Sequence, residues 1–471
     1  MRHPLTGSLV MALILAACGA TAAPSSSPAS QVAATGAASA AAKPAAAASA
    51  PAASAVAVAS IAASSAAAAS GASGPIKIGV VIPLTGSFAP LGNDSKDGLE
   101  AYLNSIKRTA GGRQIDVLYA DDQAKPDVTL TKSKELVQNQ GAAALMGFNT
   151  TPSGYAVAQW VKDAHVPMMI TTNSTAEDFF RNPNFKSPYL TRWTQTHSQI
   201  VDVGADWAAK QGFKKAAIFT SDFAPGVQAA DLFASMFIRQ GGAVAQEFYP
   251  PIGTTDFGPY LAQLSPSADV LFTFLPGIDS LRFGQQFADY GGQHKPQIVD
   301  SFGLMTSGSN VLQLKDKAVG IVTVDIFDDS NEDPGTQAFL KTWRAANGDK
   351  PLSETLVNGY VSGQVLATAI DKVQGKAEDT PAFLNALYGL SIDTAKGPVK
   401  LDQTHDIVQN VYVFKTVKAG NGYSQQLLST YKDTADTWAR PDAELASFPF
   451  GKYKGKWVGM TKAQVDQALK P

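Results

Sequence analysis

The chain has 471 residues, of which 45% are hydrophobic and 17% are charged, and its formal net charge at pH 7 is −2. This near-neutral balance provides no basic surface for nucleic acid, and the sequence holds no nucleic-acid-binding motif, so that class of function is excluded. The apolar content is sufficient for more than one hydrophobic core.

The N-terminal residues predict export from the cytoplasm. A polar start at Arg2 and His3 precedes the apolar run Leu9–Leu15. This run is far shorter than the ~20 residues of a membrane-spanning helix. Small residues follow it, as in a secretory signal peptide, which we expect to cover residues 1–17.

The end of this segment, Leu15-Ala16-Ala17-Cys18, resembles the lipobox of bacterial lipoproteins. The resemblance implies cleavage before Cys18 and attachment of lipid to its thiol and to the new amino group. The alternative is an ordinary signal with an incidental cysteine. Cys18 is the only cysteine in the chain, which also excludes an internal disulfide. We therefore expect an extracytoplasmic protein, in the periplasm or at the cell surface, anchored to a membrane by lipid.

Residues 18–74 are dominated by Ala, Ser and Pro and contain no aromatic residue. Such a segment buries too little apolar surface to offset the entropy of ordering. We interpret it as a disordered tether between the lipid and a folded part that begins near residue 75.

The folded part opens with the β-branched run Ile76–Ile82, which Pro83 ends. A loop over 84–92 then precedes a helix expected over 93–108. The apolar side chains of that helix recur at helical spacing, at Leu99, Tyr102, Leu103 and Ile106.

The alternation of strand and helix then repeats along the chain. Further strands are expected at 115–120, 143–147, 166–170, 216–220, 244–249, 269–274 and 297–301. Strands that read as continuous apolar runs between amphipathic helices are typical of parallel sheets covered on both faces. The sequence therefore predicts an α/β protein with two doubly wound parallel-sheet lobes. A long helix over 354–373 and a strand over 411–414 follow, and no role is assigned to the last 30 residues.

Five loops that follow predicted strands carry a family resemblance. They are Leu84–Gly92, Asp121–Gln123, Gly147–Ser153, Ile170–Ser174 and Ser221–Gly226. In this order and spacing, over residues 76–415, they resemble the branched-chain amino-acid-binding (Leu/Ile/Val-type) family of ABC transporter substrate-binding lipoproteins, the type I periplasmic binding proteins.

The resemblance implies two lobes joined by three crossovers, with a ligand cleft between them. Lobe one would comprise 75–195 plus 326–399, and lobe two 196–325 plus 400–471. The implied partners are a small-molecule ligand and an inner-membrane ABC permease, with the chain itself a monomer. The alternative is a ligand-sensing lipoprotein that reports to a separate signalling partner.

In open α/β sheets the ligand lies beyond the carboxyl ends of the strands, where helix N-termini favour anions. Thr150, together with its neighbour Thr151, adds short hydroxyl donors there. The resemblance implies that a ligand carboxylate is held at Thr151, Thr172, Asn173 and Ser174. Helix capping is the alternative role for such hydroxyls. Apolar walls are expected from Phe88, Leu91, Phe148 and Phe223, unless some of these pack in a lobe core.

The sequence departs from the amino-acid-binding pattern after the strand that ends near Ser301. Relatives that bind amino acids carry an acidic residue there for the ligand ammonium, whereas this chain has Phe302 and Gly303. Asp300 and Asp325 are the candidates to replace that acid. A buried cation without a partner is costly. Both an aromatic or other apolar carboxylic acid and a branched-chain amino acid therefore stay open as ligands.

Enzyme motifs are absent from the sequence. The five histidines are widely separated, and neither a metal-binding motif, a nucleophile elbow nor a phosphate-binding loop occurs. The adjacent acids Asp121 and Asp122 leave a strand in opposite directions, which favours capping or surface roles. We expect no catalytic activity, no cofactor and no metal.

Overall fold

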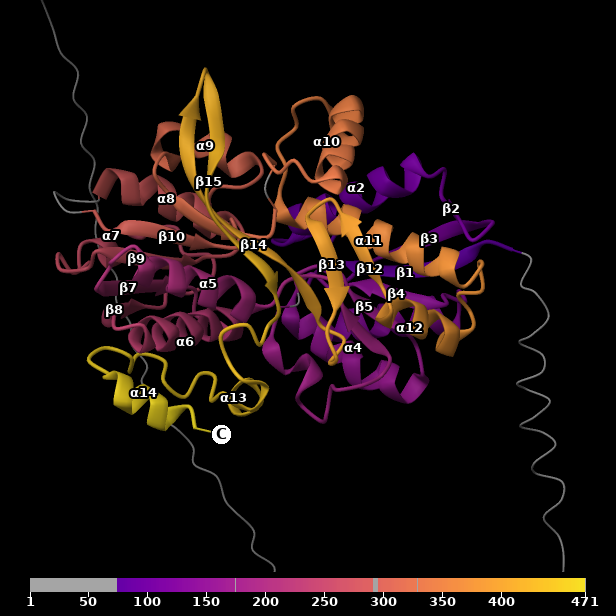
Figure 1. The fold of residues 1–471 in the computed structure, drawn as a ribbon, viewed down its shortest axis with the longest axis horizontal. Coiled ribbons are helices and arrows are strands. Elements are labelled where there is room, and N and C mark those ends of the chain that lie inside the picture. Colours follow the sequence, from indigo (N-terminus) through magenta and orange to yellow (C-terminus); the bar gives the residue numbers. More distant parts are fainter. Residues whose placement is uncertain (1–73, 174, 291–294, 328, 471) are drawn as a thin grey trace, which may run out of the picture. The chain divides into compact units, whose positions relative to one another are not determined.

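The computed structural model describes residues 74–173, 175–290, 295–327 and 329–470 (Figure 1). The predicted signal peptide, Cys18, nearly all of the tether and Ser174 lie outside the described residues. No helix within the described ranges is long and apolar enough to cross a membrane.

The first sheet is six-stranded and mostly parallel, in the order β2-β3-β1-β4-β5-β6. Its strands are β1 (Ile76–Ile82), β2 (Thr109–Ala110), β3 (Arg113–Asp121), β4 (Ala144–Gly147), β5 (Met168–Ile170) and β6 (Leu190–Arg192). Its connections contain α2 (Ala89–Ser105), α3 (Pro126–Gln138), α4 (Thr151–Ala164) and the 3-10 helix η2 (Glu177–Phe180). Every residue of β1 except Lys77 is buried, because helices cover both faces of the sheet.

The second sheet is nine-stranded and has the order β12-β13-β14-β11-β10-β9-β7-β8, with β15 paired to β14. Its parallel part consists of β7 (Lys215–Thr220), β8 (Ala243–Phe248), β9 (Val270–Phe274), β10 (Gln297–Ser301) and β11 (Val322–Asp325). The antiparallel part is β12 (Ser391–Thr394), β13 (Gly397–Leu401), β14 (Ile407–Ala419) and β15 (Gly422–Thr434). The helices of this region are α5 (His197–Lys210), α6 (Ala224–Arg239), α7 (Gly258–Leu261), α8 (Ile278–Tyr290), α9 (Ser309–Leu314) and η3 (Lys315–Ala318).

The chain returns to the first sheet after β11. Helices α10 (Pro334–Asn347), α11 (Glu354–Lys372) and α12 (Thr380–Tyr388) pack with β1 and α2 in one hydrophobic core. Strand β14 then joins the two cores, because Ile407 lies in the first and Val411 and Val413 lie in the second. In Figure 1, β14 extends from beside β13 to the hairpin that it forms with β15. The exact lobe boundaries stay a prediction.

Helix α2 begins at Ala89, four residues before the predicted start. Pro90 explains the early start, since proline is well tolerated in the first helical turn. Asp94 therefore lies inside the helix, where its carboxylate accepts a hydrogen bond from Ser353 Oγ at 2.6 Å. This contact ties α2 to the beginning of α11.

The C-terminal residues complete the second core. Beyond β15, helices α13 (Asp442–Ser447) and α14 (Lys462–Ala468) contribute to a cluster that contains the fully buried Trp457. The indole Nε1 of Trp457 donates to Asp231 on α6 at 2.7 Å. Arg440 is also buried and donates to Asp202 on α5 at 2.7 Å. This segment has no periodic pattern in the sequence, because single buried side chains anchor it.

Glycines allow α2 and α11 to approach closely. A Cβ at Gly98 would lie 2.0 Å from the carbonyl oxygen of Leu356, and one at Gly359 would lie 2.1 Å from that of Ser95.

We expect Gly98→Ala to destabilise the protein by about 1–3 kcal/mol through overpacking, although alanine ordinarily stabilises a helix relative to glycine by up to about 1 kcal/mol. Urea denaturation measures the change. Gly389→Ala is the control, because its nearest atom would lie at 3.5 Å; equal stabilities of the two variants would contradict the close approach.

Candidate functional site

A cavity of about 220 Å³ lies where loops from both sheets meet. Most of its lining comes from segments that follow β1, β3, β4, β5, β7, β8, β9 and β10, as expected for the carboxyl ends of parallel strands. The lining residues are Phe88, Leu91, Ala124, Asn149, Thr150, Thr151, Pro152, Asn173, Thr175, Phe223, Pro225, Ile252, Phe274, Pro276, Phe302, Leu304 and Glu354.

The two sides of this cavity differ in chemistry. All polar lining residues belong to the loops of the first sheet or to the start of α11: Asn149, Thr150, Thr151, Asn173, Thr175 and Glu354. The seven lining residues between β7 and β11 are all apolar: Phe223, Pro225, Ile252, Phe274, Pro276, Phe302 and Leu304. We call these two sets the polar wall and the apolar wall.

The apolar wall is built from packed aromatic rings. Phe223 stacks on Phe274 with ring centroids 6.0 Å apart, and Phe302 meets Phe274 edge to face at 5.4 Å. His197, at the start of α5, contacts both Phe274 and Phe302 from behind. Burial lowers the pKa of His197 to about 3, so its ring is neutral and adds no charge behind this wall.

The polar wall presents hydrogen-bonding atoms that have no partner in the protein. Thr172 Oγ1 donates to Asn149 Oδ1 at 3.1 Å, which leaves the Asn149 amide nitrogen without a hydrogen bond. The hydroxyl of Thr151, the first residue of α4, is likewise buried and unpaired. Buried polar groups are rarely left unsatisfied, and a helix N-terminus favours negative charge. This end of the cavity therefore suits an anionic, hydrogen-bonding group.

Asn173 and Glu354 extend the polar wall toward α11. The Asn173 amide donates to Thr355 Oγ1 at 3.2 Å, while its Oδ1 atom is buried without a partner. Glu354 is the first residue of α11 and is 4% exposed. Burial raises the pKa of Glu354 to about 7.

The structure brings most of the predicted site residues together. Phe88, Leu91, Thr150, Thr151, Asn173, Phe223 and Phe302 line the cavity. Thr172 lies behind the lining, where it orients Asn149. Phe148 is fully buried in the core of α4, β4 and β5, and it lies outside the lining.

Asp300 and Asp325 also lie outside this lining. Asp300 is buried at the end of β10, where its carboxylate accepts hydrogen bonds from Met305 N at 2.8 Å and from Thr273 Oγ1 at 3.3 Å. It therefore holds the turn that carries Phe302 and Gly303, which have φ angles of 63° and 59°. Glycine is required at 303 because a Cβ there would lie 2.6 Å from Asp325 Oδ2.

Sequence reasoning missed several lining residues. Asn149 lies in the predicted loop Gly147–Ser153, but no donor role is assigned to it from the sequence. Phe274 ends β9 and Ile252 lies in the loop after β8, two places where the sequence carries no polar motif. Glu354 has no local signal, since it lies about 180 residues beyond the other polar residues and only the return of α11 to the first sheet places it here.

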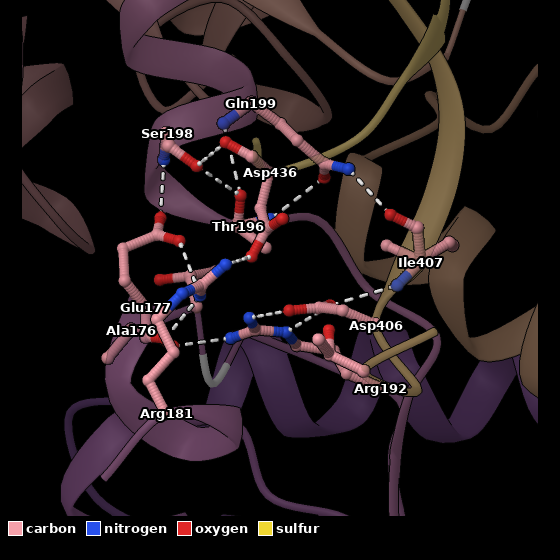
Figure 2. A network of polar contacts seen from close by, with 12 residues as sticks. Ala176, Glu177, Arg181, Arg192, Thr196, Ser198, Gln199, Asp406, Ile407 and Asp436 are labelled. Carbon is pink, nitrogen blue, oxygen red and sulfur yellow. Dashed lines mark hydrogen bonds and ion pairs between the residues drawn. The ribbon is translucent and has the colours of Figure 1, made fainter. Parts of the chain in front are cut away.

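A buried polar network connects the segments that pass between the sheets (Figure 2). Arg192, at the end of β6, forms a bidentate pair with Asp406, which precedes β14, and both side chains are fully buried. Arg192 also donates to the Ala176 carbonyl at 2.6 Å. Figure 2 shows Gln199 reaching Ile407, and this bond to the Ile407 carbonyl measures 2.8 Å.

Comparison with known proteins identifies the chain. The model of a family described as "Periplasmic binding protein" matches residues 75–421. The chain belongs to the periplasmic binding protein family. This confirms the predicted resemblance and the prediction that the chain is not an enzyme, since this is a family of solute-binding proteins.

This periplasmic binding protein is similar in sequence and in structure to several solute-binding proteins. The "Leu/Ile/Val-binding protein homolog 6" of Brucella melitensis is 30% identical over 367 residues, which cover 77% of this chain and 93% of the relative. An ABC transporter substrate-binding protein from Sphaerobacter thermophilus has a TM-score of 0.73 at 26% identity, covering 77% of this chain and 99% of that one. A solute binding protein from Rhodopseudomonas palustris BisB5, in complex with 3,4-dihydroxybenzoic acid, has a TM-score of 0.71 at 28% identity, covering 77% and 98%. These structures confirm the two-lobed α/β fold.

The buried carboxyl of Asp300 makes the stability of this binding protein depend on pH. Burial raises the pKa of Asp300 to about 7, so the folded state keeps a proton that the unfolded state releases above pH ~4. Stability is therefore lost as pH rises toward 7. We expect the native chain to lose stability from pH 5 to pH 8 while Asp300→Asn does not. The difference in their free energies of unfolding should therefore change by roughly 2–3 kcal/mol over this range, measured by urea denaturation. The exposed Asp289→Asn is the control; parallel pH profiles for all three proteins would refute this role.

Proposed function

We propose that this protein is the solute-binding lipoprotein of an ABC importer and that it captures a small aromatic carboxylic acid. The observation that supports this proposal is the division of the cavity into a polar wall with unpaired donors and an apolar wall that contains three phenylalanines. A carboxylate would accept hydrogen bonds from Asn149 and Thr151 at the start of α4. An aromatic ring would pack against Phe223, Phe274 and Phe302.

The size of the cavity supports a single ring. Its volume is about 220 Å³, and an apolar cavity of about 150 Å³ is sufficient to bind benzene. The remaining volume accommodates a carboxylate and a small substituent. Aromatic pairs add about 0.5–1.5 kcal/mol beyond the burial of their surface, which favours a ring over an aliphatic chain on this wall.

Relatives support the ligand class. Solute binding proteins of Rhodopseudomonas palustris that are 28% and 25% identical to this chain are described in complex with 3,4-dihydroxybenzoic acid and with benzoate. The Brucella relatives carry Leu/Ile/Val-binding names. A branched-chain amino acid is the second candidate, because Glu354 is an acid on the polar wall that could meet an ammonium group.

A lipid anchor and an ABC permease would connect this protein to the membrane. Cleavage before Cys18 and lipid on that residue would anchor a monomer to the membrane through the tether over 18–74. Lobe one (75–195 plus 326–399) and lobe two (196–325 plus 400–471) would close around the ligand by a hinge motion at the crossovers. The closed form would deliver the ligand to an inner-membrane ABC permease.

Thermal unfolding of the purified protein with added ligands tests the ligand class. We expect benzoate or a hydroxybenzoate at 100 times its Kd to stabilise the protein by about 2.7 kcal/mol, which raises Tm by a few degrees. Leucine, isoleucine and valine are expected to give no shift. A larger shift with leucine than with every aromatic acid would refute the proposal.

Titration calorimetry of Thr151→Val tests the carboxylate site. We expect a loss of roughly tenfold in affinity for the aromatic acid, because the substitution removes one hydroxyl donor and keeps the side-chain shape. Thr131→Val, on the exposed face of α3, is the matched control. Unchanged affinity in Thr151→Val would place the carboxylate elsewhere.

A further inference from the structure

Glu354 is the one ionisable side chain among the described residues that line the cavity. It is fixed in place, since its neighbour Thr355 accepts the hydrogen bond from Asn173 and Ser353 caps α11 through the Leu356 amide. A buried acid at a ligand-facing position has to be matched by protein or ligand groups. The protein groups that already pair with Glu354 therefore determine which chemical group of a ligand can contact it.

The hydrogen bonds of Glu354 leave one oxygen atom free. Gln195 Nε2 and Asn358 Nδ2 both donate to Oε1, the latter at 2.8 Å. Within the described part of the chain, no group donates to Oε2. Glu354 lines this cavity and also a neighbouring cavity of about 270 Å³. A carboxylate oxygen with no protein donor is available to a donor on a ligand.

The charge of Glu354 already has a counterpart in the protein. Lys396 is 1% exposed, and its ammonium donates to the Trp193 carbonyl at 3.1 Å and to Asn358 Oδ1 at 2.9 Å, so Asn358 links it to Glu354. Burial lowers the pKa of Lys396 to about 7, and the charges of Glu354 and Asp325 oppose this shift. Burial holds the pKa of Asp325 well above its usual value, and the charge of Glu354 also raises it, which favours the neutral form of Asp325.

An ammonium group on the ligand would add a cation near Lys396, where burial already disfavours the charged form. A hydroxyl group would satisfy Oε2 without adding charge. We propose that the solute is a ring-hydroxylated aromatic acid and that Glu354 accepts the hydrogen bond of its hydroxyl group. The inference rests on the proposed function, because it assumes that an aromatic carboxylate occupies this cavity.

The test is titration calorimetry of the full-length protein with benzoate, 3-hydroxybenzoate, 4-hydroxybenzoate, 3,4-dihydroxybenzoate, leucine and phenylalanine. We expect at least one hydroxylated acid to bind roughly tenfold or more tightly than benzoate, as a hydrogen bond to a charged group provides. Glu354→Gln should reduce this preference to less than about threefold, because its amide places a donor where the carboxylate had an acceptor. The surface substitution Glu135→Gln should retain the full preference.

Glu354→Asp keeps the carboxylate and should retain part of the preference for hydroxylated acids over benzoate. This second variant allows the test even if Glu354→Gln folds poorly. Thermal unfolding of each ligand-free variant checks folding. Benzoate that binds as tightly as every hydroxylated acid would overturn the inference and leave the proposed function intact. A full preference for hydroxylated acids in Glu354→Gln would also overturn the inference and leave the proposed function intact. Binding of leucine or phenylalanine without binding of any aromatic acid would overturn both.

Discussion

The parallel pairing of β1 between β3 and β4 is the constraint on which the site depends. The register places Ile82 beside Asp121 and Val81 beside Gly147, and β5 continues it with Ile170 beside Gly147. All these strands therefore end at one edge of the sheet. The loops that follow have to share that edge, so the residues that form the polar wall of the cavity meet there although they come from separate parts of the chain.

The buried charges gather where the chain passes between the two sheets. The Arg192–Asp406 pair is fully buried and joins the ends of two crossing segments. Glu354 and Lys396 lie close by, since Lys396 donates to the carbonyl of Trp193, the residue after Arg192. A buried pair that loses one partner costs about 3–5 kcal/mol. These groups therefore fix the path of the crossovers, and through Glu354 they also reach the cavity.

In the proposed function, the two walls of the cavity have different roles in ligand recognition. The polar wall supplies direction, because donors that are buried and unpaired in the protein gain most from a ligand that satisfies them. The apolar wall supplies contact area and contains no charged or hydrogen-bonding side chain. The left-handed turn at Phe302 and Gly303, held by Asp300, completes that wall. Phe302 thereby places aromatic surface where the family resemblance leads us to expect an acid for the ligand amine.

The sequence by itself determined the class of fold and most of the cavity-lining loops. The length and the apolar character of a strand are local properties, so the runs at 76–82, 143–147 and 166–170 predicted parallel strands. The loops after them contain Phe88, Thr151 and Asn173. Only the tertiary structure decided that Phe148 faces the core, that Asp300 supports a turn and that Glu354 enters the lining. Those outcomes depend on contacts between residues far apart in the chain, such as α2 against α11, which leave no local pattern in the sequence.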